Sequence, residues 1–183
     1  QVYWATGTTN TPFAVPPGWT SSGQPQTYAL WGSDAPASGL IFSDTIPDGQ
    51  AAMYFGNAST SVSPAPTYGP NHNVNFSSPP TFTPFYGGPS KLWQTVNTPA
   101  TPAPSYVLNF WVSGEDAAIN GFGQRGVFGM KLTNVLPGDP QMYFEVPNTS
   151  INPSFRLEFF FTPINPLAPV MLEFTNWGHI SAT

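Results

Sequence analysis

The chain of 183 residues contains no cysteine. This absence excludes disulfide bonds, thiolate nucleophiles and zinc sites built on cysteine. Small secreted domains often depend on disulfides for their stability. We therefore expect this protein to be stabilised by its hydrophobic core or by assembly with neighbouring subunits.

Charged residues are also scarce, at 7% of the chain, whereas an average soluble protein has about 25%. Lysine and arginine number only 4 against 9 acidic residues, which gives a net charge of −5. Proteins bind nucleic acids and anionic membranes through basic side chains. The composition therefore argues against both partners, and the apolar runs are too short for membrane insertion.

Aromatic side chains, proline and glycine are abundant instead. The chain has 15 Phe, 7 Tyr and 6 Trp, together with 23 prolines and 17 glycines. Such proline and glycine contents are typical of disorder, but disordered chains lack large apolar side chains. The composition therefore predicts short strands joined by stiff proline-rich loops, in a single β domain over residues 1–183.

The C-terminal quarter shows the two-residue period of half-buried strands. In the segment 154–161, Arg156 and Glu158 fall on one face and four apolar residues fall on the other. These four are Phe155, Leu157, Phe159 and Phe161. Because side chains alternate between the two faces of a strand, this pattern indicates a sheet with one buried face.

Similar short segments recur along the chain, and no sustained helical period appears. We predict strands at Val2–Ala5, Thr27–Trp31, Leu40–Ser43, Ala52–Phe55, Leu92–Val96, Tyr106–Val112, Val127–Leu132, Met142–Val146, Phe155–Phe161, Val170–Thr175 and His179–Ser181. This spacing predicts an all-β fold, either an antiparallel β-sandwich or a jelly-roll-like barrel with long proline-rich loops. Tyr106–Val112 is apolar on nearly both faces, so we expect it in the centre of a sheet.

The segment 58–104 has a different composition, with ten prolines and many aromatic residues. Proline cannot donate a hydrogen bond to a strand ladder. We therefore predict that only Leu92–Val96 pairs within this segment. The remainder is expected to form an ordered surface excursion whose aromatic side chains pack on the sandwich.

Residues suited to catalysis or metal binding are few. His72 and His179 are accompanied by no Gly-x-Ser-x-Gly motif, so we expect structural or surface roles for both. Glu158 and Glu173 could lie on the same face of adjacent strands and act as a glycosidase pair. We favour the other interpretation, that they are charges on an outer sheet face that keep the sheet soluble. The calcium-type ligands around Glu115 lack EF-hand spacing. We therefore predict no catalytic residue, no metal site and no cofactor.

Aromatic and amide side chains are better suited to carbohydrate recognition. Trp19 lies in a Pro-Pro-Gly-Trp segment, and Trp31 precedes Gly-Ser-Asp. Tyr68 and Tyr86 lie in the proline-rich excursion. These four residues are our candidates for ligand binding, whereas we expect Trp111 in the core.

Two segments carry a resemblance to a known family. Residues 135–146 read Val-Leu-Pro-Gly-Asp-Pro-Gln-Met-Tyr-Phe-Glu-Val, and residues 170–182 read Val-Met-Leu-Glu-Phe-Thr-Asn-Trp-Gly-His-Ile-Ser-Ala. This Pro-Gly turn, the apolar strands and the closing hairpin resemble the end of calicivirus-type capsid protruding domains. The resemblance covers the last quarter of the chain.

The resemblance implies a viral structural protein, namely a protruding domain on the surface of a non-enveloped virion. Its expected location is extracellular, and its role is in virion assembly and attachment to a host receptor or glycan. We expect contact with other capsid subunits and at least a dimer, since few charges oppose association. The alternative is a carbohydrate-binding module or a phage tail receptor-binding head. A β-sandwich glycoside hydrolase is a third hypothesis, although we expect no enzyme activity.

Overall fold

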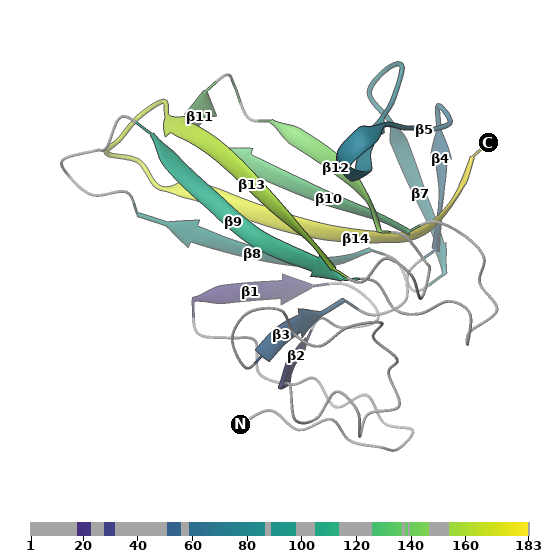
Figure 1. Cartoon of the computed structure of the whole chain (residues 1–183), viewed down its shortest axis with the longest axis horizontal. Coiled ribbons are helices and arrows are strands. Elements are labelled where there is room, and N and C mark those ends of the chain that lie inside the picture. Colours follow the sequence, from purple (N-terminus) through teal and green to yellow (C-terminus); the bar gives the residue numbers. More distant parts are fainter. Residues whose placement is uncertain are drawn as a thin grey trace.

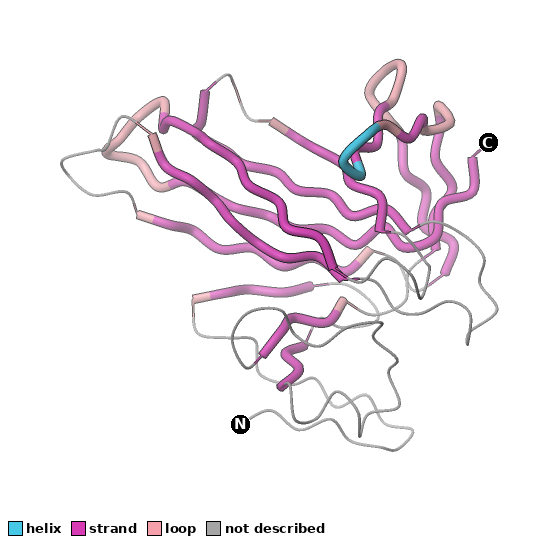
Figure 2. Tube along the Cα trace, viewed as in Figure 1, coloured by secondary structure: helices cyan, strands magenta, loops and turns pink. Residues whose placement is uncertain are grey.

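The computed structural model describes residues 18–22, 28–31, 51–55, 59–86, 89–97, 105–113, 126–136, 138, 140–146 and 154–182. In these ranges the chain is almost entirely β-strand, with one short 3-10 helix, η1 (Pro70–His72) (Figures 1 and 2). Within them, no helix has the length and apolar character needed to cross a membrane. The predicted strands Val2–Ala5 and Leu40–Ser43 lie outside the described residues.

The large sheet has nine strands and is organised around β14 (Val170–Ala182). Its main path runs β1 (Trp19–Ser22), β8 (Ser90–Val96), β14, β10 (Gly126–Thr133), β12 (Gln141–Val146), β6 (Asn73–Asn75) and β5 (Thr67–Tyr68). Neighbours along this path are antiparallel. β4 (Ser59–Ser63) pairs in parallel with the C-terminal end of β14 and antiparallel with β7 (Thr81–Tyr86).

Two smaller sheets complete the described structure. A three-stranded antiparallel sheet has the order β11 (Val135–Leu136), β13 (Ser154–Pro163) and β9 (Tyr106–Ser113). In a two-stranded sheet, β2 (Tyr28–Trp31) pairs antiparallel with β3 (Ala51–Tyr54). In Figure 1, β9 and β13 form a layer over β10 and β14.

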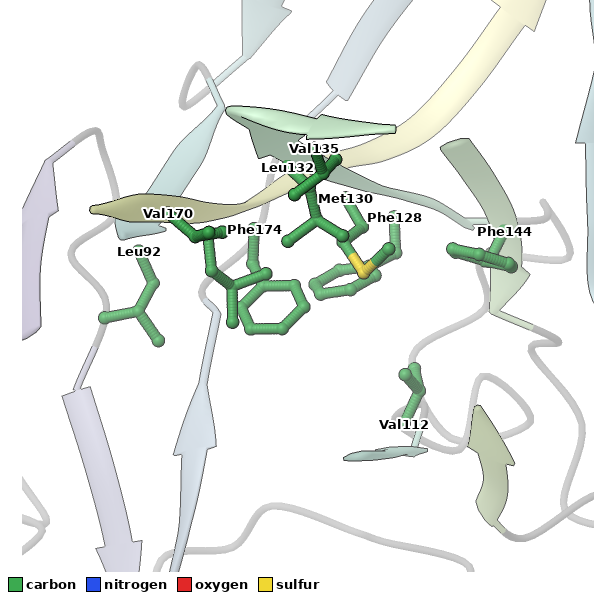
Figure 3. Packing of buried hydrophobic residues seen from close by; sticks show 10 residues of the cluster. Leu92, Val112, Phe128, Met130, Leu132, Val135, Phe144, Val170 and Phe174 are labelled. Carbon is green, nitrogen blue, oxygen red and sulfur yellow. The ribbon is translucent and has the colours of Figure 1, made fainter. Parts of the chain in front are cut away.

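The main core fills the space between the three-stranded sheet and the large sheet. Its buried members are Leu92, Val112, Phe128, Met130, Leu132, Val135, Phe144, Val170, Leu172 and Phe174. Val112 of β9 lies across the core from the members on the large sheet, such as Phe128 and Phe174 (Figure 3). The apolar face predicted for 154–161 packs against this cluster. The all-β prediction is confirmed, and of the two architectures we predicted the structure has the β-sandwich.

A second buried cluster lies on the opposite face of the large sheet. Val62, Val74 and Val127 are buried but are not members of the main core. Aromatic rings accompany them, and we call the following seven residues the outer cluster: Val62, Val74, Phe76, Phe82, Val127, Tyr143 and Trp177. Phe82 of β7 lies 4.1 Å from Trp177 of β14 and 5.5 Å from Tyr143 of β12, measured between ring centroids. The large sheet therefore curls so that β7 approaches β12. The partial burial of Tyr143 in this cluster raises the pKa of its hydroxyl group.

Our prediction that only Leu92–Val96 pairs within 58–104 was wrong. Four further strands, β4 to β7, lie in this segment and belong to the large sheet. Most of the prolines in its described part fall between the strands. Pro84 lies within β7, which pairs only with β4 among the described strands. An edge strand tolerates proline because its outward N–H needs no ladder partner.

Asn134 connects the β10–β11 junction to the turn between β13 and β14. Its backbone is left-handed, with φ of 63°. Its side-chain Nδ2 donates to the carbonyl oxygens of Asn165 at 2.9 Å and Ala168 at 3.0 Å. Its Oδ1 accepts a hydrogen bond from the backbone N–H of Asn165 at 3.0 Å. This one side chain therefore holds the turn against the end of β10.

We expect Asn134→Ala to lower the free energy of unfolding by about 2 kcal/mol. The three lost hydrogen bonds are largely exposed and contribute only about 0.5 kcal/mol each, and alanine tolerates the left-handed backbone poorly. Urea unfolding followed by fluorescence measures the change. Asn134→Gly is the matched control, because it removes the side chain and relieves the backbone. An alanine variant as stable as the wild type would contradict this account.

Candidate functional site

The four predicted ligand-binding residues are not brought together as one site. Trp19 lies on the edge strand β1, half-buried, and its ring packs against the main core and stacks on Phe174 at 6.1 Å. Tyr68 lies on β5, at the other end of the main path of the large sheet, and is exposed. The side chains of Trp31 and Tyr86, on β2 and β7, lie outside the described residues. Their binding roles stay a prediction, but Trp19 occupies a strand that contacts the core rather than an open loop.

The placement that we predicted for Tyr106–Val112 was wrong. This segment forms β9, which is an edge strand of the three-stranded sheet. Leu108 and Phe110 pack against the core, while the alternate residues are exposed. Trp111, which we expected in the core, is 45% exposed. Only one face of β9 is covered within the described structure, so the apolar character of both faces misled the prediction.

The exposed side of β9 and β13 presents three rows of paired residues. Trp111 is opposite Arg156, Asn109 is opposite Glu158, and Val107 is opposite Phe160. All six side chains are exposed, and Phe160 is 73% exposed. We call these six residues the β9–β13 face. Because paired residues on one face lie about 5 Å apart, Trp111 and Arg156 are direct neighbours.

The β9–β13 face combines aromatic surface with unused hydrogen-bonding groups. Arg156 and Glu158 form no ion pair with any described residue. Arginine offers only donors, an ionised glutamate only acceptors, and an asparagine both. The formal charges of Arg156 and Glu158 cancel, so the face has no net charge. It can therefore hydrogen-bond a neutral, hydroxyl-rich ligand while an aromatic ring packs on the ligand's apolar surface.

The two strand glutamates that we considered as a glycosidase pair lie in different sheets. Glu158 is on β13 in the three-stranded sheet, and Glu173 is on β14 in the large sheet. Glu173 Oε1 lies 3.1 Å from the Lys91 ammonium and accepts a hydrogen bond from the Thr175 hydroxyl at 3.4 Å. The adjacent-strand arrangement that we considered for these two glutamates is therefore wrong, and it gives no support to a carboxylate pair.

Of the other candidates for chemistry, the structure describes only the side chain of His72. His72 in η1 is half-buried, and its ring stacks on Phe155 at 4.0 Å. His179 is on β14, and its side chain is not among the described ones. The segment around Glu115 also lies outside the described residues. Within the ranges given above, no three His, Cys, Asp or Glu side chains are grouped to hold a metal ion.

Comparison with known proteins supports the fold. No protein-family model matches the chain, and no curated protein matches it. Among solved structures, it is similar to the carbohydrate-binding module TmCBM61, determined in complex with β-1,4-galactotriose, with a TM-score of 0.52 and 12% sequence identity. The similarity covers 89% of this chain and 79% of that chain. At this identity the similarity shows a shared β-sandwich fold, and the calicivirus-type resemblance stays a prediction.

Proposed function

We propose that this protein is a carbohydrate-binding domain and that it binds glycans at the β9–β13 face. The observation that carries the proposal is the exposed ring of Trp111 beside Arg156, with Asn109 and Glu158 in the next row. Sugars combine apolar C–H faces with many hydroxyl groups. An indole face packs on the C–H faces, and mixed hydrogen-bond donors and acceptors bind the hydroxyl groups.

Two further considerations favour glycan binding over a purely structural role. An exposed tryptophan leaves a large apolar surface in water, and such residues are enriched where proteins bind partners. The fold similarity to TmCBM61, whose structure contains a galactotriose, points in the same direction. The proposed function needs no catalytic residue, metal or cofactor.

We expect Trp111→Ala to weaken glycan binding at least ~30-fold, since an anchoring aromatic contact contributes about 2 kcal/mol. Titration calorimetry with β-1,4-galactotriose, cellotriose and xylotriose measures the affinity. Leu167→Ala is the control, because Leu167 is also exposed and apolar but lies in the β13–β14 turn. It should bind as the wild type does.

The thermal unfolding temperatures of both variants should stay close to that of the wild type, because neither side chain is buried. A Trp111→Ala variant that is folded and keeps its full affinity would overturn this site. A wild-type protein that binds none of the three sugars, nor any neutral glycan on an array, would overturn the function itself.

A further inference from the structure

We propose that the β9–β13 face is an extended platform for a neutral, linear glycan that lies along the strands. Trp111 holds one end of this glycan and Phe160 holds the other. This inference rests on the proposed function and adds the class, direction and length of the ligand. It assigns a binding role to Phe160, Asn109, Arg156 and Glu158.

The spacing of the three rows sets the length of the ligand. The pairing of β9 with β13 is regular from Ser154 to Phe161, so the rows follow each other without a bulge. Residues on one face of a strand recur at every second position, which is about 7 Å. The row of Trp111 and the row of Phe160 are therefore about 14 Å apart. One sugar ring cannot reach both aromatic residues, whereas about three linked rings can.

The charge of the face selects a neutral ligand. Glu158 belongs to the middle row and pairs across the strands with Asn109 rather than with a basic residue. A sugar carboxylate placed over this row would face the Glu158 carboxylate at short range, and like charges at such distances repel. Hydroxyl groups, in contrast, can donate to Glu158 and accept from Arg156.

The distribution of apolar and polar residues argues against a protein partner. Protein interfaces have an apolar, fully desolvated centre surrounded by a polar rim. The β9–β13 face has the reverse order, with the polar pair Asn109 and Glu158 in the middle row and aromatic residues in the outer rows. A flat protein surface would bury the Glu158 carboxylate, which forms no ion pair with Arg156 or any other described residue, and burying an unpaired charge is costly. A glycan leaves this carboxylate partly hydrated and offers it hydroxyl donors.

A chain-length series tests the inference. Calorimetry is run with β-1,4-linked oligosaccharides of galactose, glucose and xylose, from the monosaccharide to the pentasaccharide. For the series that the wild type binds best, we expect affinity to rise at least ~10-fold up to about the trisaccharide and to change less than ~2-fold beyond it. Phe160→Ala should weaken trisaccharide binding about 5- to 10-fold while changing disaccharide binding less than ~2-fold.

The outcomes separate this inference from the proposed function. Two results would overturn the platform while leaving glycan binding at Trp111 intact. One is that Phe160→Ala weakens the binding of oligosaccharides of every length equally, and the other is that the affinity of the wild type does not depend on oligosaccharide length. A galacturonic acid trisaccharide should bind at least ~5-fold more weakly than β-1,4-galactotriose, and equal or tighter binding would overturn the neutral ligand class. Failure of the wild type to bind any sugar would overturn both proposals. Phe160 is largely exposed, so Phe160→Ala is expected to fold normally.

Discussion

Replacing Phe174 with alanine is expected to lower the free energy of unfolding by about 4 kcal/mol. Phe174 is 8% exposed and lies on the core face of β14. Its ring centroid lies 5.4 Å from that of Phe128 in the same sheet and 4.9 Å from that of Phe110 in the opposite sheet. The substitution therefore opens a cavity at the place where the two layers of the sandwich meet, and rigid strands cannot close it.

Guanidinium unfolding measures this loss. Native domains are stable by about 5–15 kcal/mol, so the variant loses a large part of its stability. Phe160→Ala serves as the matched control, because it removes the same side chain from the exposed face of the neighbouring sheet. We expect it to change the stability by less than about 0.5 kcal/mol. Equal effects of the two substitutions would be incompatible with the sandwich core.

The second large effect is expected at Gly129, where valine should cost about 3 kcal/mol by overpacking. Gly129 is buried on β10 and faces the outer cluster. A Cβ atom there would lie 3.1 Å from Nε1 of Trp177 and 3.7 Å from Cδ1 of Tyr143. Trp177 has little freedom to withdraw, because Phe82 stacks on its ring at 4.1 Å between centroids. The absence of a side chain at Gly129 therefore leaves the space that the indole of Trp177 occupies.

Gly126 provides the control for this substitution on the same strand. A Cβ atom there would meet its nearest neighbours at 3.7 Å, which is ordinary contact. Gly126→Ala should therefore leave the stability unchanged or raise it slightly, because alanine restricts the unfolded chain more than glycine does. Thermal unfolding and the near-ultraviolet signal of Trp177 distinguish the two substitutions. If Gly129→Val were as stable as Gly126→Ala, the outer cluster could not be packed as described.

The alternation of side chains was sufficient to predict the fold class. In the segment 154–161 the sequence separates Arg156 and Glu158 from four apolar residues, and the structure exposes the first group and packs the second on the core. This succeeds because the two-residue period of a strand is a local property. The pairing of strands is not local, which is why the sequence left open a neighbouring position for Glu158 and Glu173 that the structure does not have.

Strand β4 shows why part of the sheet was missed. Its sequence is Ser-Thr-Ser-Val-Ser, which has little apolar character, yet Thr60 and Val62 are both buried. The Thr60 hydroxyl donates to the backbone carbonyl of Trp177 at 3.0 Å, 117 positions away in the sequence. A polar side chain that is satisfied by such a distant partner looks like a loop residue when the sequence is considered alone.

The candidate site was missed for a related reason. Trp111 and Trp19 both follow patterns that allow burial or exposure. The structure exposes Trp111, which we expected in the core, and packs the half-buried ring of Trp19 against the core. Asn109 contains the signal that could have decided the question. It shares a face with Trp111, and an amide amid apolar residues indicates that this face meets water rather than the core.

The position of β14 has a consequence for the synthesis of the protein. It is the last strand of the described chain, yet it lies inside the large sheet and pairs with β10, β8 and β4. A nascent polypeptide that has not yet reached residue 170 leaves the edges of β8 and β10 open, and open edges promote aggregation. Parallel pairing of β4 with β14 joins Ser59 to His179, which are 120 positions apart (179 − 59). Such distant contacts make folding slow, so the large sheet can assemble only after β14 has been synthesised.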